Sequence, residues 1–244
     1  MIILEVCANS VQSAIEGQKG GATRVELCNN LAAGGITPSI AQIEIARKLL
    51  NIELNILIRP REGNFFYNDL EFEIMKNDIH HCGKMGCDGV VVGILNSDRT
   101  IDTERNEQLV KISRQYNMSV TFHKAFDCCV NLMESLYIIV SLGCDRILTS
   151  GGRKTVIEGR ENLKELIIHG GDKIIIMPGG GITENNIHEL VQFTNLKEFH
   201  GSFKKSIKSE MNNIPTAVDE LYKTFIFETD SQKVKDALLN ANKV

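Results

Sequence analysis

The chain has 244 residues, of which 27 are Lys or Arg and 31 are Asp or Glu, and its formal net charge is −4. No stretch concentrates basic residues as a nucleic-acid-binding surface would, so we expect no nucleic-acid partner. The apolar runs are far too short to cross a bilayer, and the first five residues lack the basic start of a signal peptide. We therefore expect a cytoplasmic protein with no membrane partner.

The cysteines indicate the same compartment. Seven cysteines, an odd number, are scattered through apolar runs and loop starts without a regular spacing. This pattern is typical of a reducing environment in which most thiols are buried core groups. The length would allow two domains, but closed α/β barrels of this size commonly form one. We expect one domain over residues 1–244.

Short β-rich runs alternate along the chain with longer segments of helical character. The predicted strands cover residues 2–6, 24–27, 53–58, 89–92, 119–122, 146–148, 173–177 and 198–200. The predicted helices between them cover residues 11–19, 40–50, 70–84, 104–115, 132–142, 161–169 and 184–193. The alternation breaks down at about residues 202–230, which we predict to be an irregular loop region over one face. A last helix is predicted at about residues 231–240.

The alternation of strands and helices predicts parallel strands joined by right-handed crossovers. Eight such units in a single domain are what a (β/α)8 TIM barrel requires, and this α/β fold is our prediction. A doubly wound open sheet is the alternative. Strands covered by helices on both faces are apolar throughout, whereas several of these runs alternate polar and apolar residues. The alternation favours the barrel, whose inward side chains converge on a mouth at the carboxyl ends of the strands.

Two strands end in the same pattern, Glu5-Val-Cys7 and Glu26-Leu-Cys28. Because side chains alternate along a strand, each Glu shares a face with its own Cys, and neighbouring parallel strands would gather both pairs. Thiolates are soft ligands that select Cu(I) or Zn²⁺, and neighbouring arginines would make the thiolates more available, so Cys7 and Cys28 are candidate metal ligands. In the alternative interpretation, both cysteines are ordinary buried core residues.

Ionisable groups at other strand ends are candidate catalytic residues. His123 follows the fifth strand, and Asp127 could orient it as a general base or acid. Glu5 and Glu26 are further candidates, and we expect them to pair with Arg59, Arg61 or His123 because buried charges need partners. Lys124 is expected to point outward because it alternates with His123. An internal salt-bridge network with no catalytic role is the alternative.

Glycine-rich segments follow the last two barrel strands. Gly179, Gly180 and Gly181 come after the seventh strand, and His200-Gly201-Ser202 ends the eighth. TIM barrels often bind phosphate there with backbone N–H groups, and Arg59 and Arg61 offer two guanidinium groups for a carboxylate or phosphate. Tight turns without a ligand, and arginines paired with Glu5 and Glu26, are the alternative interpretation.

The assembled motifs resemble the copper homeostasis protein CutC family. The resemblance rests on an ordered series of segments from Met1 to about Ser202, which are Leu4-Glu-Val-Cys7, Gly21-Ala-Thr-Arg-Val-Glu-Leu-Cys28, Gly34-Gly-Ile-Thr-Pro-Ser39, Ile58-Arg-Pro-Arg61 with Phe65-Phe-Tyr67, Asp88-Gly-Val-Val-Val-Gly93, Thr121-Phe-His-Lys-Ala-Phe-Asp127, Leu148-Thr-Ser-Gly151, Met177-Pro-Gly-Gly-Gly-Ile182 and Glu198-Phe-His200. It implies a cytoplasmic TIM barrel, dimeric or higher, linked to copper tolerance. It also implies Cu(I) binding at Cys7 and Cys28.

Two functions follow as hypotheses. In the first, the protein binds Cu(I) through Cys7 and Cys28 and acts in copper homeostasis, as a homo-oligomer such as a dimer or tetramer. In the second, it is a TIM-barrel enzyme of unknown reaction that acts on a small anionic or phosphorylated molecule at the barrel mouth. No organic cofactor is implied by either.

Overall fold

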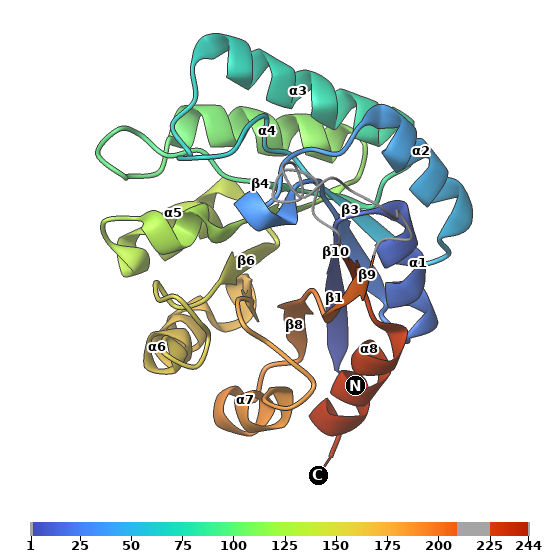
Figure 1. The fold of residues 1–244 in the computed structure, drawn as a ribbon. Helices are drawn as coiled ribbons and strands as arrows, with labels where there is room; N and C mark the ends of the chain where they lie inside the picture. The colour runs from blue at the N-terminus through green and yellow to red at the C-terminus, as the bar shows by residue number, and fades with distance from the viewer. Residues whose placement is uncertain (1, 209–224, 244) are drawn as a thin grey trace, which may run out of the picture.

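Eight parallel strands form a barrel in the computed structural model, which describes residues 2–208 and 225–243 (Figure 1). Each of the first six strands pairs with the next one along the chain, and the eighth pairs with the first. The last seam, between the seventh and eighth strands, carries one isolated bridge, Gly179 with His200. The strands are β1 (Ile3–Ala8), β2 (Arg24–Leu27), β3 (Glu53–Leu57), β4 (Gly89–Val92), β5 (Ser119–Phe122), β6 (Arg146–Thr149), β7 (Ile175–Pro178) and β8 (Glu198–Gly201).

Helices form a ring around these strands, which confirms the predicted (β/α)8 barrel (Figure 1). The helices are α1 (Val11–Lys19), α2 (Ile40–Leu49), α3 (Asp69–Lys84), α4 (Thr103–Gln115), α5 (Leu132–Leu142), α6 (Arg160–Gly170), α7 (Ile187–Thr194) and α8 (Ser231–Ala241). The last of these, α8, packs against both α7 and α1 and so completes the ring. A short 3₁₀ helix, η2 (Lys124–Cys128), follows β5.

The two faces of the strands have different chemistry, as the alternation in the sequence predicts. In β1, Leu4 and Val6 belong to the apolar layer between barrel and helices. Glu5 and Cys7 alternate with them and face the interior, where both are buried. Because an apolar side chain gains about 25 cal/mol for each Å² removed from water, the outer layer supplies most of the stability and leaves the interior free for polar groups.

The turns that lead from a helix into the next strand repeat one arrangement. Asp88 pairs with Arg47 and accepts a hydrogen bond from the N–H of Leu54 at 2.8 Å. Two strands later, Asp145 pairs with Arg114 and accepts a hydrogen bond from the N–H of Val120. In both cases one carboxylate ties together two neighbouring βα units, so the same turn sequence performs the same task twice.

The connection between β8 and α8 differs from the prediction of an irregular loop over residues 202–230. Two of its segments, β9 (Lys204–Lys208) and β10 (Phe225–Thr229), pair as antiparallel strands, and β10 lies beside α1. Residues 209–224 lie outside the described residues. The predicted last helix is present as α8.

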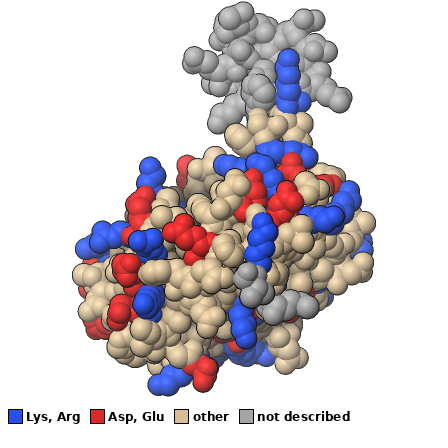
Figure 2. Space-filling model, turned by 90° about the horizontal axis from the view of Figure 1, so that it is seen from below, with Lys and Arg blue, Asp and Glu red and all other residues tan. Residues whose placement is uncertain are grey.

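The surface carries both signs of charge. In the face shown in Figure 2, Lys and Arg are mixed with Asp and Glu, and no broad surface of one sign is visible. This mixture agrees with the near-balance of charges in the sequence. In the described part of the chain, no helix has both the length and the apolar character needed to cross a membrane.

Candidate functional site

A cavity of about 580 Å³ opens at the carboxyl ends of the barrel strands. This is the end at which TIM barrels place their functional groups. Of the residues singled out from the sequence, the cavity wall includes Cys7, Glu26, Cys28, Arg59, His123, Gly180, Gly181, His200 and Ser202. Lys124 also lines the cavity, although the sequence pattern predicted that it points outward.

Two thiols lie side by side in this wall. Cys7 is the last residue but one of β1, and Cys28 directly follows β2. Their sulfur atoms are 3.9 Å apart, and both thiols are free. The strand register places Cys7 opposite Glu26. Cys28 comes two residues after Glu26, so its side chain lies on the same inward face as that of Glu26. Metal–thiolate bonds are roughly 2.3 Å long for zinc, so both sulfurs can reach one ion between them.

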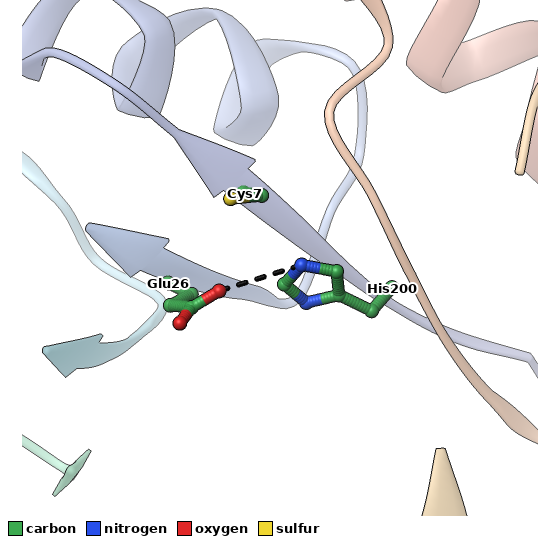
Figure 3. Close-up of side chains that lie close together, drawn as sticks. All are labelled: Cys7, Glu26 and His200. Carbon is green, nitrogen blue, oxygen red and sulfur yellow. Dashed lines mark ion pairs between the residues drawn. The ribbon is translucent and has the colours of Figure 1, made fainter. Parts of the chain in front are cut away.

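A carboxylate and an imidazole complete the group around the first thiol. Ligand atoms of Cys7, Glu26 and His200 all lie within 4.8 Å of one another, and all three residues are buried (Figure 3). His200 lies 3.4 Å from Glu26 through its Nε2 atom. This group offers one sulfur, one nitrogen and one oxygen, and the sulfur of Cys28 lies next to that of Cys7. Sulfur and nitrogen donors are typical of a transition-metal site rather than of a calcium or magnesium site.

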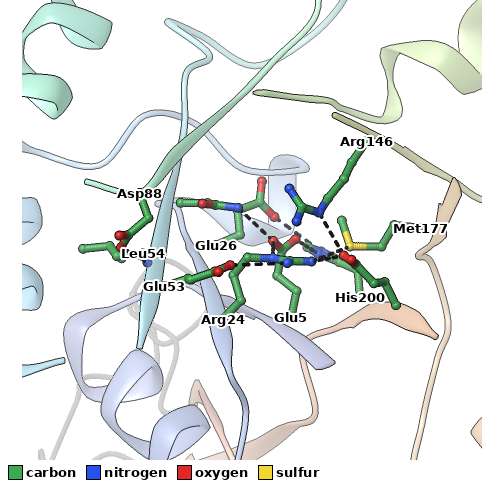
Figure 4. A network of polar contacts seen from close by, with 11 residues as sticks. Glu5, Arg24, Glu26, Glu53, Leu54, Asp88, Arg146, Met177 and His200 are labelled. Atoms are coloured by element: carbon green, nitrogen blue, oxygen red, sulfur yellow. Dashed lines mark hydrogen bonds and ion pairs between the residues drawn. The ribbon is translucent and has the colours of Figure 1, made fainter. Parts of the chain in front are cut away.

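A buried ion-pair network supports this group from inside the barrel (Figure 4). The guanidinium of Arg24 donates to Glu5 and to Glu198, each at 2.6 Å, and Glu198 also accepts from Arg146 at 2.8 Å. Glu5 in turn accepts from the Nδ1 atom of His200 at 2.8 Å. Glu5 is thus a structural anchor that orients His200 and does not line the cavity itself.

The predicted partners of the two glutamates were wrong. The sequence analysis expected Arg59, Arg61 or His123, but Glu5 pairs with Arg24 and His200, and Glu26 lies beside His200. The physical reason is register, because Arg24 is opposite Glu5 in the β1–β2 pair and His200 is opposite Glu5 in the β1–β8 pair.

The network separates the pKa values of the two carboxyl groups. Burial alone would raise the pKa of Glu5, but the hydrogen bond from His200 and the charge of Arg24 outweigh burial and lower that pKa to about 2. Burial raises the pKa of Glu26 to about 7, with a further contribution from the charge of Glu5. Near neutral pH, the carboxyl group of Glu5 is therefore ionised, whereas that of Glu26 is partly protonated.

Neighbouring arginines do not lower the pKa of the Cys7 thiol, in contrast to the prediction from the sequence. The contact with Cys28, burial and the charges of Glu26 and Glu5 raise the pKa of Cys7 well above its ordinary value. The two arginines that were expected to lower it are engaged elsewhere. Arg59 donates to the backbone carbonyls of Ala33, Gly35 and Gly63, and Arg61 pairs with Glu71. A metal ion would therefore have to displace the proton from the sulfur of Cys7.

Arg59 and Arg61 also differ in position. The cavity is lined by Arg59 but not by Arg61, whose side chain is tied to Glu71 and to the loop that follows β3. Two residues with one residue between them share a face in a strand. This rule does not apply to Arg59 and Arg61, because both lie beyond the end of β3. Of the two predicted anion-binding arginines, the structure therefore places only Arg59 in the cavity wall.

Asp127 does not orient His123. Its carboxylate accepts hydrogen bonds from Lys124 at 2.7 Å and from the backbone N–H groups of Ser150 and Gly152. It therefore holds the loop after β6 in place and lies outside the cavity wall. Lys124 turns toward the cavity because it begins η2 rather than extending β5, so strand alternation no longer applies to it.

His123 is buried against the cavity with only one ring nitrogen in use. Its Nδ1 atom accepts a hydrogen bond from the N–H of Ala125 at 3.2 Å, which caps the first turn of η2. Its Nε2 atom is buried and has no hydrogen-bond partner in the described part of the chain. Burial and the charge of Arg59 lower the pKa of His123 to about 3, so the ring is neutral.

The fold and this site define a class of protein, a TIM barrel with a thiol, carboxylate and imidazole group at the carboxyl end of its strands. The sequence places it more narrowly, because the CutC family model matches residues 2–205. The chain belongs to the CutC family.

Similar proteins cover nearly the whole chain. A CutC family protein of Parabacteroides distasonis is 41% identical over 96% of this chain and 98% of its own length. One from Bacteroides fragilis is 42% identical over 97% and 96%. The crystal structure of CutC from Streptococcus agalactiae, described as a copper homeostasis protein, is 39% identical, with a TM-score of 0.78 over 83% of this chain and 99% of that one.

Other solved barrels share only the fold. Phosphoribosylanthranilate isomerase from Thermotoga maritima covers all of this chain with a TM-score of 0.59, but its sequence identity is 11%. This similarity confirms the barrel architecture and carries no information about the reaction.

Proposed function

We propose that this member of the copper homeostasis family binds Cu(I) through Cys7 and Cys28 at the barrel mouth, with Glu26 and His200 beside them. The observation that carries the proposal is the 3.9 Å separation of the two sulfurs in the wall of an open cavity. Cu(I) is a soft ion that thiolates select, and here it is cargo to be bound and released.

The neighbouring groups fit the release of protons that binding requires. The thiol of Cys7, whose pKa is raised well above its ordinary value, loses its proton when it binds an ion. Glu26, with its pKa of about 7, and His200, whose pKa is raised by Glu5 and Glu26 against the opposing effect of burial, lie within reach to accept and pass on protons. The affinity for Cu(I) should therefore rise with pH.

A Cu(I) titration against a competing chelator under reducing conditions tests the proposal. The double variant Cys7→Ser/Cys28→Ser should bind Cu(I) more weakly by over about a hundredfold, since hydroxyl oxygens are poor ligands for this ion. The matched control is Cys128→Ser/Cys129→Ser, which removes two thiols that are adjacent in sequence and outside the cavity wall. If both double variants bind as the parent does, with the same ratio of copper to protein, the proposal fails.

We also propose a cytoplasmic location and a homo-oligomer, either a dimer or a tetramer. All seven cysteines are free, which fits a reducing compartment. Large apolar side chains are exposed on the consecutive helices α2 and α3, including Ile45, Leu49, Leu70 and Ile74, and such a surface favours self-association. The mass in solution, measured by light scattering, should be a multiple of the 27.2 kDa chain mass.

A further inference from the structure

A second part of the cavity wall, formed after β5, β7 and β8, carries hydrogen-bond donors with no acceptor in the described residues. The backbone N–H groups of Gly181, Ile182 and Ser202 donate to none of those residues. The Nε2 atom of His123 is likewise unpartnered, although this residue is only 4% exposed. We propose that this wall binds a small phosphorylated molecule, with the phosphate at the three N–H groups and a carbonyl oxygen of the same molecule at His123.

The phosphate part of the proposal rests on backbone geometry and charge. Gly180 and Gly181 have φ angles of +119° and +78°, which side chains rarely allow, and these angles turn the chain so that the cavity is bordered by bare backbone. Consecutive N–H groups in such a turn form a concave anion site. Glycine also leaves room for a cation, because the Nζ atom of Lys124 lies 3.3 Å from the position that a Cβ on Gly180 would occupy.

The cation is held in place before any ligand arrives. Lys124 donates to Asp127 and to the hydroxyl of Ser150, each at 2.7 Å. Lys204 and Lys233 lie in the same cavity wall and add positive charge, and the acidic side chains of this wall are Glu26 and Glu184. A fixed ammonium beside free N–H groups favours a dianion such as a phosphate monoester over a neutral molecule.

The carbonyl part of the proposal rests on the tautomer of His123. Because Nδ1 accepts the N–H of Ala125, the single proton of the neutral ring is on Nε2, which makes Nε2–H a donor. The ring lies over Gly93, where a Cβ would be 2.6 Å from both Cε1 and Nδ1, and its centroid is 4.9 Å from that of Phe65. A neutral imidazole fixed in this way stabilises charge on a carbonyl oxygen without giving up a proton.

The phosphate site is separate from the proposed copper site, because it uses none of the four side chains proposed there, namely those of Cys7, Cys28, Glu26 and His200. The cavity volume of about 580 Å³ lies within the range of small-molecule sites and leaves room for a phosphorylated sugar fragment. The two proposals can therefore succeed or fail separately.

Calorimetric titration of the full chain with inorganic phosphate and with dihydroxyacetone phosphate tests the inference at low ionic strength. We expect saturable binding of both, unchanged in Cys7→Ser/Cys28→Ser. Lys124→Met should weaken the binding of both by about tenfold, since it removes one charge-assisted contact, and Lys124→Arg should retain most of it. Thermal unfolding of each variant checks that it is folded.

A matched pair of variants tests His123. In His123→Asn, the amide oxygen replaces Nδ1 and keeps the cap on η2, but no donor reaches the position of Nε2. In His123→Gln, the longer amide places a donor there. We expect His123→Asn to bind inorganic phosphate as the parent does and dihydroxyacetone phosphate about tenfold more weakly, and we expect His123→Gln to recover that loss.

Two results would overturn the phosphate site, and a third would overturn the carbonyl contact. The first is that neither inorganic phosphate nor dihydroxyacetone phosphate shows saturable binding at up to about 10 mM, a concentration that fills even a weak site. The second is unchanged phosphate affinity in a folded Lys124→Met variant. The third is equal behaviour of His123→Asn and His123→Gln toward dihydroxyacetone phosphate, which would remove the carbonyl contact from the proposal.

Discussion

Arg24 is the residue on which the barrel interior depends most. Its guanidinium is almost fully buried and contacts Glu5 and Glu198 directly, with Glu53 at 3.4 Å on the more exposed side. Burying a guanidinium group inside a barrel costs desolvation free energy, which is offset only when neighbouring carboxylates pair with the group. Because Glu5 also accepts from His200, the position of Arg24 sets the orientation of a group in the cavity wall that Arg24 itself does not touch.

Glu26 should make the stability of the metal-free protein depend on pH. Its pKa is raised from 4.5 to about 7 in the folded chain, so folding is favoured by the neutral carboxyl below pH 4.5, and this contribution is lost as pH rises through 7. The loss amounts to about 3 kcal/mol, at 1.36 kcal/mol for each pKa unit.

Urea unfolding at about pH 5 and pH 8 measures this effect. The free energy of unfolding of Glu26→Gln should fall less over this range than that of the parent, because glutamine does not titrate. Equal falls for the two proteins would show that Glu26 is ionised in the folded chain throughout the range.

The repeated helix-to-strand turn is a feature at the scale of elements. Asp88 and Asp145 each join an arginine of one helix to the backbone of the strand that follows it. Both carboxylates are partly exposed, so each arrangement should contribute modestly to stability. Because the arrangement occurs twice, its contribution to the free energy of unfolding can be measured separately at Asp88 and at Asp145.

Asp145→Asn and Asp88→Asn should each lower the free energy of unfolding by about 1 kcal/mol, through the loss of a charge-assisted contact to arginine. The two carboxylates share no hydrogen-bond partner, so the double variant should lose the sum of the two effects. Denaturant unfolding of all four proteins provides the comparison. A double variant that loses much more than the sum would contradict the view that the two turns act separately.

The elements themselves were largely predictable from the sequence. The strands β2, β4 and β5 have the predicted bounds, as do α1 and α5, because hydrophobic periodicity and turn residues are local signals. The antiparallel pair β9–β10 was missed, because each strand is short, polar or exposed and gains its pairing from a segment distant in sequence. The start of β7 at Ile175 was also missed, since a 3₁₀ turn occupies Gly171–Lys173.

The candidate site was predictable in part. The strand ends identified Cys7, Cys28, Glu26, His123 and His200, all of which line the cavity. The sequence could not show which charges pair, because that depends on register between strands, nor that Lys124 turns inward, because the break between β5 and η2 changes the alternation. Asp127 was misassigned for the same reason, since its partners lie on the loop after the next strand.

Closure of the barrel involves the whole molecule. The helix α8 comes last in the chain but lies between α1 and α7, so the ring of helices is complete only when the C-terminal segment returns to the first unit. Val234 is fully buried in α8, and a Cβ on Gly20 would lie 2.5 Å from the Cβ of Val234. The glycine after α1 therefore allows the last helix to dock closely.

Val234→Ala should lower the free energy of unfolding by about 2 kcal/mol, because it leaves a cavity at this junction. Leu239→Ala on the same helix is the control, since Leu239 is 58% exposed and its loss should cost little. Chemical denaturation of both variants gives the comparison. Similar losses in the two would show that α8 contributes no specific packing to closure.

The seam between β7 and β8 has a consequence for how the barrel responds to its contents. The other neighbouring strands are joined by at least two residue pairs, whereas in the described residues this boundary has the single bridge between Gly179 and His200. Gly181 and Ile182 stand on one side of that boundary and Ser202 on the other. A molecule that binds to both sides of this boundary would link β7 to β8. Its binding should therefore protect β8 against local opening and slow the hydrogen exchange of its backbone amides.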